Sequence, residues 1–254
     1  MIPDIAGLGA FGPAVVAALL IAGYLVVGEP WAGAVLHRRF EAALERDRSA
    51  RLWLYRRLLV LEWGLVALVA GVVVVAPDVT WGQLGLRWPD QAPGVLAVAL
   101  GVAVLAFLVL STGVVRTSAR RGSQDAAGGA LGSSAVVALI PRTTVERRWF
   151  GFVAVTAGWC EEILYRGFFL AVVVAIVPNV SDPVLVLTTA VAFGIAHAYQ
   201  GVAGVITTGV LGAILGSLYV GTGTLLAPIL VHAAIDLRIL WLPRSILPPD
   251  PVPG

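Results

Sequence analysis

The chain has 254 residues, of which 59% are hydrophobic and 13% are charged, and its mean hydropathy is +0.92. A soluble domain of ordinary composition is about 45–50% apolar and about 25% charged. These values exclude a water-soluble globule, a disordered chain and a fibrous repeat, and they predict a protein whose main solvent is lipid. The single cysteine, Cys160, excludes a disulfide framework and a multi-cysteine zinc site, so we expect it to be a packing residue.

The charged residues are unusual because all 17 basic residues are arginine. Together with the abundance of alanine, valine and glycine, this indicates a bacterial genome rich in G and C. The arginines cluster between apolar runs and form no tract with interleaved aromatic residues, so we expect no nucleic-acid partner. The first residues lack a basic region, and we therefore expect the first apolar run to be a membrane anchor, not a cleaved signal peptide.

Apolar runs long enough to span a membrane recur along the whole chain, since a helix needs about 20 apolar residues to cross a bilayer core. They are residues 5–27, 58–76, 94–115, 149–177, 183–199, 201–220 and 225–242. The run at 149–177 gives an eighth span if it divides near Gly167. The sequence thus predicts an all-α, polytopic membrane bundle of seven or eight transmembrane helices.

The connections divide the chain into three parts. In the N-terminal part, residues 1–148, apolar residues recur at helical intervals among charges over 35–55. This pattern predicts an amphipathic helix on the inner membrane surface, with His37 as a surface residue. Residues 120–134 are rich in glycine, serine and alanine and are expected to be flexible. Thr143 and Glu146 have the spacing of a capping box, which begins a new helix. We expect residues 149–242 to form the catalytic transmembrane core and the proline-rich residues 243–254 to form a disordered tail.

The distribution of arginine predicts the orientation. Residues 28–57 carry seven arginines and 116–148 carry six, whereas 77–93 carry one and 178–182 carry none. Loops rich in arginine stay in the cytosol. We therefore expect the N-terminus outside and the C-terminus in the cytosol, in the inner membrane of a bacterium.

A few ionisable residues lie inside the apolar runs. Inserting each of them at mid-membrane costs about 2.5–3.5 kcal/mol unless the side chain is paired or faces a water-filled cavity. They are Glu62, Glu161, Glu162, Arg166, His197, His232 and Asp236. Counting along the helices places Glu161, His197 and His232 in the cytosolic half of the bilayer. Gly204, Thr208, Gly212 and Gly216 recur at intervals of four, which is typical of close helix packing.

The first polar group is Glu161-Glu162 with Arg166. Glu162 and Arg166 are four residues apart on one helix face, so we expect them to form an ion pair that supports the structure. Glu161 is rotated by roughly 100° and has no local partner. A carboxyl group buried away from water suits a general base.

The other two groups each pair a histidine with a neighbour four residues away. Phe193 shares a helix face with His197, which read alone is more often a buried, hydrogen-bonded residue than a catalyst. His232 and Asp236 share the same spacing, which is typical of a carboxylate that orients a neutral imidazole. Three such groups on three spans predict either a hydrolytic site or an ion pathway.

In this order, Glu-Glu-x-x-x-Arg, Phe-x-x-x-His and His-x-x-x-Asp resemble the signature of the CPBP family. This family comprises CAAX prenyl endopeptidases of the Ras-converting type, bacteriocin-processing proteins and Abi proteins. The resemblance covers about residues 149–241. It implies an all-helical intramembrane endopeptidase, usually of eight spans, whose interior site opens toward the cytosol.

The resemblance also implies roles for the motif residues. Glu161 with His197 would activate the attacking water, His232 and Asp236 would stabilise the tetrahedral oxyanion, and Glu162 and Arg166 would hold the site in shape, with Phe193 beside them. The prenyl-protein branch typically has Asn where this chain has Asp236. An ionised Asp cannot donate a hydrogen bond, so this departure concerns the oxyanion role that the resemblance implies for Asp236.

The expected cofactor is none or one Zn²⁺. Glu161, His197 and His232 could supply two imidazoles and one carboxylate to zinc, with an open fourth position. We favour a metal-free site, because we expect the helices to offer few groups that orient metal-binding imidazoles.

The sequence leaves other functions open. A membrane-anchored protein or peptide is the expected substrate, and a prenylated CAAX protein is not expected in a bacterium. An ion or proton transporter would predict an internal repeat, and none is visible between the two halves. A non-catalytic immunity or scaffold protein would use the same motifs to bind without cleaving.

Overall fold

The computed structural model describes residues 5–47, 49–89, 94–120, 134–242 and 247, and within these ranges the chain is helical, without strands. The elements, in chain order, are η1 (Leu8–Ala14), α1 (Val15–Gly23), η2 (Tyr24–Gly28), α2 (Glu29–Leu44), α3 (Ala50–Val75), α4 (Val95–Arg120), α6 (Ser134–Leu139), α7 (Thr144–Glu161), η3 (Glu162–Phe169), α8 (Leu170–Ile176), α9 (Asp182–Ala196), η4 (Ala198–Gln200), α10 (Gly201–Thr222), α11 (Leu226–Leu237) and η5 (Arg238–Trp241).

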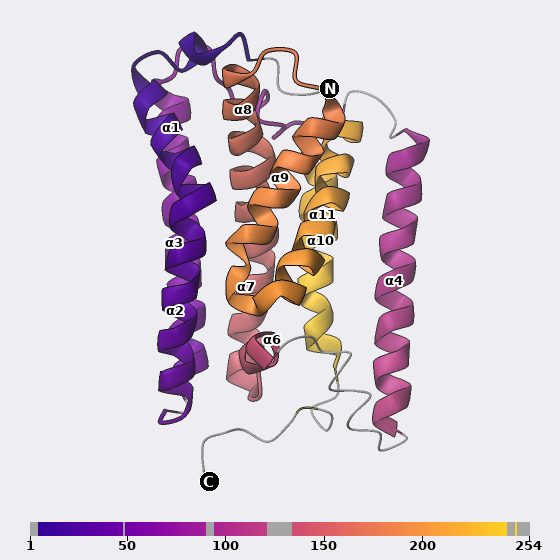
Figure 1. Cartoon of the computed structure of the whole chain (residues 1–254). Helices are drawn as coiled ribbons and strands as arrows, with labels where there is room; N and C mark the ends of the chain where they lie inside the picture. The colour runs from indigo at the N-terminus through magenta and orange to yellow at the C-terminus, as the bar shows by residue number, and fades with distance from the viewer. Residues whose placement is uncertain (1–4, 48, 90–93, 121–133, 243–246, 248–254) are drawn as a thin grey trace.

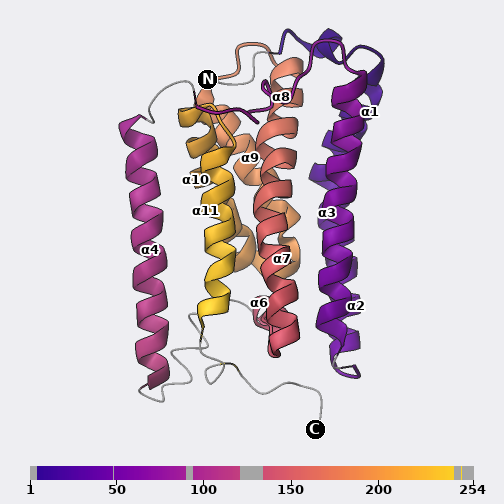
Figure 2. The ribbon, with the colours of Figure 1, turned by 180° about the vertical axis from the view of Figure 1, so that it is seen from behind.

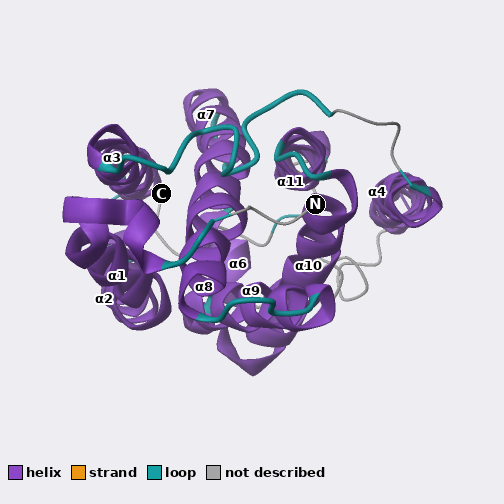
Figure 3. Ribbon diagram, turned by 90° about the horizontal axis from the view of Figure 1, so that it is seen from above, coloured by secondary structure: helices purple, strands orange, loops and turns teal. Residues whose placement is uncertain are grey.

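The long helices run side by side along one direction (Figures 1 and 2). Seen from above, α1, α2 and α3 form one group, α7, α8 and α9 lie in the middle, and α10 and α11 lie beside them (Figure 3). Helix α4 stands at the outer edge, where it contacts α10 and α11. The motif-bearing helices therefore occupy the centre of the bundle.

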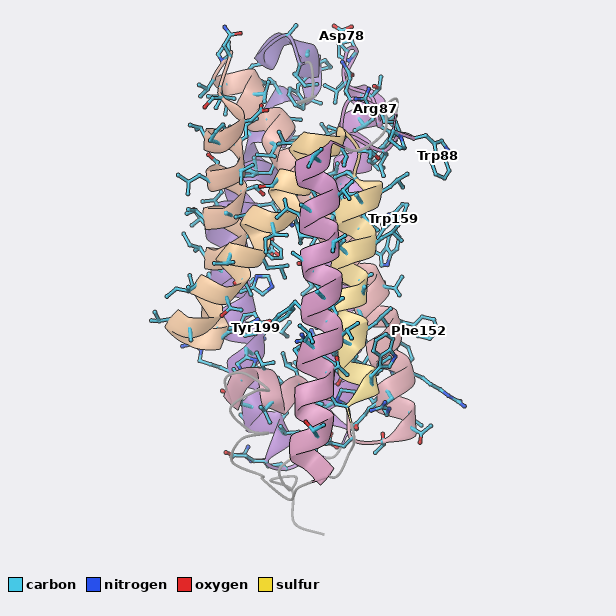
Figure 4. The ribbon with its side chains drawn as sticks, turned by 90° about the vertical axis from the view of Figure 1, so that its right-hand side faces the viewer. Asp78, Arg87, Trp88, Phe152, Trp159 and Tyr199 are labelled. Carbon is cyan, nitrogen blue, oxygen red and sulfur yellow. The ribbon has the colours of Figure 1, made fainter. Side chains whose placement is uncertain are left out.

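The outer surface has the character of a membrane protein. By length and composition, three helical stretches are apolar enough to span a membrane, namely Leu8–Leu44, Ala50–Val75 and Ala198–Thr222, and Val98–Gly113 and Asp182–Ala196 are shorter apolar helices. Large apolar side chains point outward from the bundle, and Figure 4 shows this for Phe152 and Trp159 on α7. The prediction of an all-α membrane bundle is confirmed.

The prediction of one surface helix over residues 35–55 is wrong. Helix α2 continues the first apolar stretch to Leu44, and α3 begins anew at Ala50, so the two halves of that segment belong to two packed helices. Between them, the carboxylate of Asp47 accepts hydrogen bonds of 2.7 Å from the Ser49 backbone N–H and hydroxyl, which forms the turn. His37 is buried against Tyr199, with ring centres 5.0 Å apart, and so is not a surface residue.

The run at 149–177 does not divide near Gly167. Helix α7, the π-helical η3 and α8 follow one another without a break over 144–176. The described residues therefore hold seven long helical runs, not eight. Gly167 lies inside η3. A Cβ there would lie 2.9 Å from the Leu84 carbonyl oxygen, so the absence of a side chain at Gly167 allows the two segments to pack closely.

The start of α7 agrees with the sequence. Thr143 and Glu146 form the predicted capping box, in which each side chain accepts from the backbone N–H of the other residue. Helix α7 thereby begins at a fixed residue, which determines the position of Glu161 at its end. The expected flexible segment at 120–134 and the expected disordered tail lie almost wholly outside the described residues.

Glycines set the spacing of the central helices. A Cβ at Gly158 of α7 would lie 2.8 Å from the Ala233 backbone nitrogen of α11, and one at Gly194 of α9 would lie 2.8 Å from the Val205 carbonyl oxygen of α10. Gly212 and Gly216 pack against α9, as the stripe of small residues predicts. These approaches bring three motif-bearing segments to one place.

Candidate active site

The three motifs meet around one cavity of about 310 Å³. Glu161 ends α7, His197 follows the last residue of α9, and His232 and Asp236 lie one turn apart on α11. All four side chains line the cavity, together with the Phe193 ring. The sequence-predicted residues are therefore neighbours in space.

Glu162 is the centre of a buried network. Its Oε1 accepts hydrogen bonds of 2.7 Å from Arg166 Nη1 and of 2.7 Å from His232 Nδ1. The Arg166 guanidinium also donates to the Gly212 carbonyl oxygen at 3.3 Å and lies 4.4 Å from the Phe193 ring centre. Glu162 and Arg166 have no exposed surface and His232 is 3% exposed, so this network fixes the imidazole against the end of α7.

The orientation of His232 differs from the expectation. Glu162 from the facing helix, and not Asp236, holds Nδ1 of the imidazole. The other ring nitrogen, Nε2, lies 3.8 Å from Glu161 Oε2 and 3.7 Å from Asp236 Oδ2. Asp236 is one turn further along α11, and its side chain is 34% exposed toward the cavity. His232 thus presents Nε2 between two carboxylates.

His197 is oriented by its own helix. Its Nδ1 is 2.8 Å from the Phe193 carbonyl oxygen, and since a carbonyl oxygen only accepts, Nδ1 carries the proton of this bond. The ring centres of His197 and Phe193 are 4.6 Å apart, which confirms that the two side chains share one helix face. In the neutral imidazole, Nε2 is then the nitrogen that can accept a proton.

Three further polar residues join the site. Glu29, Glu62 and Tyr199 line a small cavity of about 110 Å³ together with Glu161 and His197. Among the described residues, Oε2 of Glu62 and Oε2 of Glu161 are buried without a hydrogen-bond partner. Glu62 was recognisable in the sequence as an intramembrane acid, whereas Glu29 and Tyr199 lie at the ends of apolar runs and gave no motif.

The larger cavity extends toward the end of the bundle that holds the α2–α3 turn. Val136 and Leu139 of α6 line it there, and Figure 4 shows Tyr199 on that lower half. Helix α6 is held in place by α3, since Arg51 Nε donates to the Ala138 carbonyl oxygen at 2.9 Å and Tyr55 Oη to that of Leu139 at 2.6 Å. Apolar side chains of α6 thus line the cavity where it approaches this end of the bundle.

The geometry bears on zinc in two ways. Both imidazoles have Nδ1 anchored, to a carboxylate and to a carbonyl, which is how metal-ligating histidines are usually oriented. Our premise that such groups are few was wrong. Within the described ranges, however, no group of three His, Cys, Asp or Glu side chains lies close enough together to hold a metal ion. The carboxylate of Glu161 and the imidazoles of His197 and His232 therefore do not surround one common point in this arrangement.

Comparison with known proteins gives a family match for the segment that carries these motifs. Residues 145–238 match the family model described as Type II CAAX prenyl endopeptidase Rce1-like. Searches among curated proteins and solved structures gave no match. The matched segment contains every motif residue, from Glu161 to Asp236, and spans α7 to α11. Residues 145–238 therefore form an Rce1-like domain of the CPBP family of intramembrane proteases, in a membrane-embedded helical bundle.

Proposed function

We propose that this protein is an intramembrane endopeptidase that hydrolyses a peptide bond in a membrane-anchored protein or peptide. The observation that carries the proposal is the pair formed by Glu161 Oε2 and His232 Nε2, 3.8 Å apart on the wall of a cavity inside an apolar bundle. Hydrolysis of an acyl group by water needs a carboxylate and an oriented imidazole beside an enclosed space, and this pair supplies both groups.

In the proposed reaction, the Glu161 carboxylate takes a proton from a water molecule, and the water oxygen attacks the carbonyl carbon of the scissile peptide bond. His197 orients this water, because its Nε2 can accept a hydrogen bond while Nδ1 donates to Phe193. Glu161 then returns the proton to the leaving amine, which breaks the C–N bond.

His232 and Asp236 have the second role, at the oxyanion. Because Glu162 accepts from Nδ1, the free ring nitrogen Nε2 faces the cavity and, when it carries a proton, donates to the developing negative charge. Asp236 lies 3.7 Å from the same nitrogen and can donate only in its protonated form. Glu162 and Arg166 are positioning residues.

A zinc-dependent version of the same reaction is the second candidate, because both imidazoles are oriented through Nδ1 as metal ligands usually are. In that version Glu161, His197 and His232 would hold the ion, which would polarise the substrate carbonyl and activate water. We favour the metal-free version because the described donors are not gathered at one point. Elemental analysis of zinc in the purified protein, together with peptidase assays in the presence of a chelator, separates the two versions.

The decisive experiment compares Glu161→Gln with the unchanged protein. Both are purified in lipid and incubated with a library of membrane-anchored peptides, and the products are identified by mass spectrometry. Gln keeps the size and polarity of Glu161 but cannot take a proton, so we expect cleavage to disappear while the protein stays folded. Undiminished turnover in this variant would remove Glu161 from the mechanism.

The matched control is Glu45→Gln, the same exchange at an exposed residue of the α2–α3 turn. We expect it to cleave at the rate of the unchanged protein. If the unchanged protein cleaves no peptide but retains some of them, the binding of a partner without hydrolysis becomes the better explanation. If it instead moves protons across a sealed vesicle, the carboxylates form an ion pathway.

A further inference from the structure

A third cavity lies away from the motifs, between α2 and α3. It is a groove of about 810 Å³ that opens on the outer surface of the bundle. Its polar end is formed by Arg39 of α2 and by Arg56 and Arg57 of α3, and its apolar part by Trp31, Val35 and Val60, among others. The described residues that line it include three arginines and no acidic side chain. The groove therefore pairs a concentrated positive charge with an apolar wall.

The two helices place these parts at different depths. Arg39 lies about 8 Å along α2 from its end at Leu44, and Arg56 and Arg57 lie about 10 Å along α3 from its start at Ala50, so the three cations share one level near the turn. Trp31 lies about 20 Å from the same end, deeper in the apolar belt. The groove thus runs from a cationic level into the membrane interior.

Two of the cations are held over aromatic rings. The Arg57 guanidinium lies 4.6 Å from the ring centre of Trp53, and that of Arg56 lies 5.1 Å from the ring centre of Trp149 on α7. Tryptophan next to arginine is typical of the level where lipid headgroups meet the acyl chains. Basic pockets between membrane helices recognise anionic headgroups.

We propose that this groove binds an anionic phospholipid of the adjacent leaflet. The phosphate contacts Arg39, Arg56 and Arg57, and an acyl chain lies along α2 and α3 toward Trp31. A wall of Ala32, Leu36 and Leu61 lines both the groove and the small cavity that contains Glu161. Because this wall separates the occupant from the motif residues, the groove suits a resident lipid and not the scissile segment of a substrate.

The test is lipid binding by native mass spectrometry of the full chain in detergent, titrated with phosphatidylglycerol, cardiolipin or phosphatidylcholine. We expect the anionic lipids to bind at least about tenfold more tightly than phosphatidylcholine. The triple variant Arg39→Gln, Arg56→Gln, Arg57→Gln should lose this preference. The matched control is Arg38→Gln, Arg46→Gln, Arg148→Gln, which removes equal charge at exposed positions outside the groove and should retain it.

A second variant, Val35→Trp, fills the apolar part and leaves the arginines in place. We expect it to weaken the binding of phosphatidylglycerol by about tenfold without changing the binding of inorganic phosphate. Equal binding of anionic and neutral lipids, equal losses in both triple variants, or competition by phosphate alone would each overturn the proposal. A groove closed by a second copy of the chain would also overturn it, and would show as a dimer that takes up no lipid.

Discussion

One oxygen of Glu162 holds both Arg166 and His232 at 2.7 Å in a place without exposed surface. If Arg166 is replaced by methionine, the carboxylate remains buried without its cation. Removing one partner of a buried ion pair costs about 3–5 kcal/mol. We therefore expect Arg166→Met to lower the melting temperature of the purified protein strongly, or to abolish its accumulation in membranes.

The double variant Glu162→Gln, Arg166→Met separates stability from catalysis. It removes both charges, so we expect it to be more stable than Arg166→Met alone. Peptidase activity should stay low, because Gln holds His232 Nδ1 less firmly than a carboxylate. The control Arg148→Met, at an exposed position of α7, should leave the melting temperature unchanged. A stable Arg166→Met protein would mean that the pair does not support the fold.

Asp236 distinguishes two models of the oxyanion site. If it donates a hydrogen bond to the oxyanion, Asp236→Asn supplies an NH₂ donor at every pH, and activity should persist and decline less at alkaline pH than in the unchanged protein. If an ionised Asp236 supports His232 or a metal, a loss of about 10–100-fold is expected. We expect retained activity, measured as the rate against pH for both proteins. A folded but inactive Asp236→Asn protein would refute the donor model.

At the residue scale, the sequence identified the groups but not their partners. Spacing along one helix revealed Glu162 with Arg166 and Phe193 with His197, because residues four apart share a face. It assigned His232 to Asp236 on the same helix, whereas the buried partner, Glu162, comes from another helix. Local spacing carries no information on such contacts, and for the same reason it did not place Glu29 or Tyr199 at the site.

At the element scale, the contact between α7 and α11 determines how Glu161 meets His232. Gly158 lies one turn before Glu161 and touches Ala233, the neighbour of His232. A methyl group at Gly158 would have to push α11 away, because the backbone nitrogen of Ala233 is 2.8 Å from its position. A misplacement of about 1 Å at reacting groups can cost about 10²-fold in rate. We expect Gly158→Ala to lose most peptidase activity and to destabilise the protein by about 1–3 kcal/mol.

The control is Gly71→Ala in α3, where a Cβ meets nothing within 4 Å. Alanine is the better helix former by about 1 kcal/mol, so this variant should be as stable as the unchanged protein or slightly more stable. Activity assays and thermal unfolding of both variants make the comparison. Full activity in Gly158→Ala would show that the two helices can separate without moving the reacting groups.

The elements were predictable where a local signal marks them and not where packing decides. The capping box of Thr143 and Glu146 gave the start of α7. The break between α2 and α3 was missed, because the charges around Asp47 fit a helical period as well as they fit a turn. The close neighbour of Gly167 is the carbonyl oxygen of Leu84, a residue distant in the chain, so the local sequence does not reveal this contact. The apolar runs therefore predicted the helical bundle, but they did not predict whether its central helix is continuous.

At the scale of the whole molecule, charge differs between the two ends of the bundle. The end with the α2–α3 turn carries Arg38 and Arg46, and the start of α7 adds Arg148. Figure 4 shows Asp78, Arg87 and Trp88 at the opposite end. Arginine-rich ends remain in the cytosol, so the cavity, which extends toward the α2–α3 turn, should open to the cytosol.

Two single-cysteine variants test this orientation, in a background where the buried Cys160 is replaced by serine. Glu45→Cys places a thiol in the α2–α3 turn, and Ser181→Cys places one before α9 at the other end; both positions are exposed. In intact bacterial cells that produce the protein, a membrane-impermeant maleimide should label Ser181→Cys at once. It should label Glu45→Cys only after the cells are permeabilised, and the background protein not at all. Labelling of Glu45→Cys in intact cells would place the arginine-rich end outside, and the site would then open away from the cytosol.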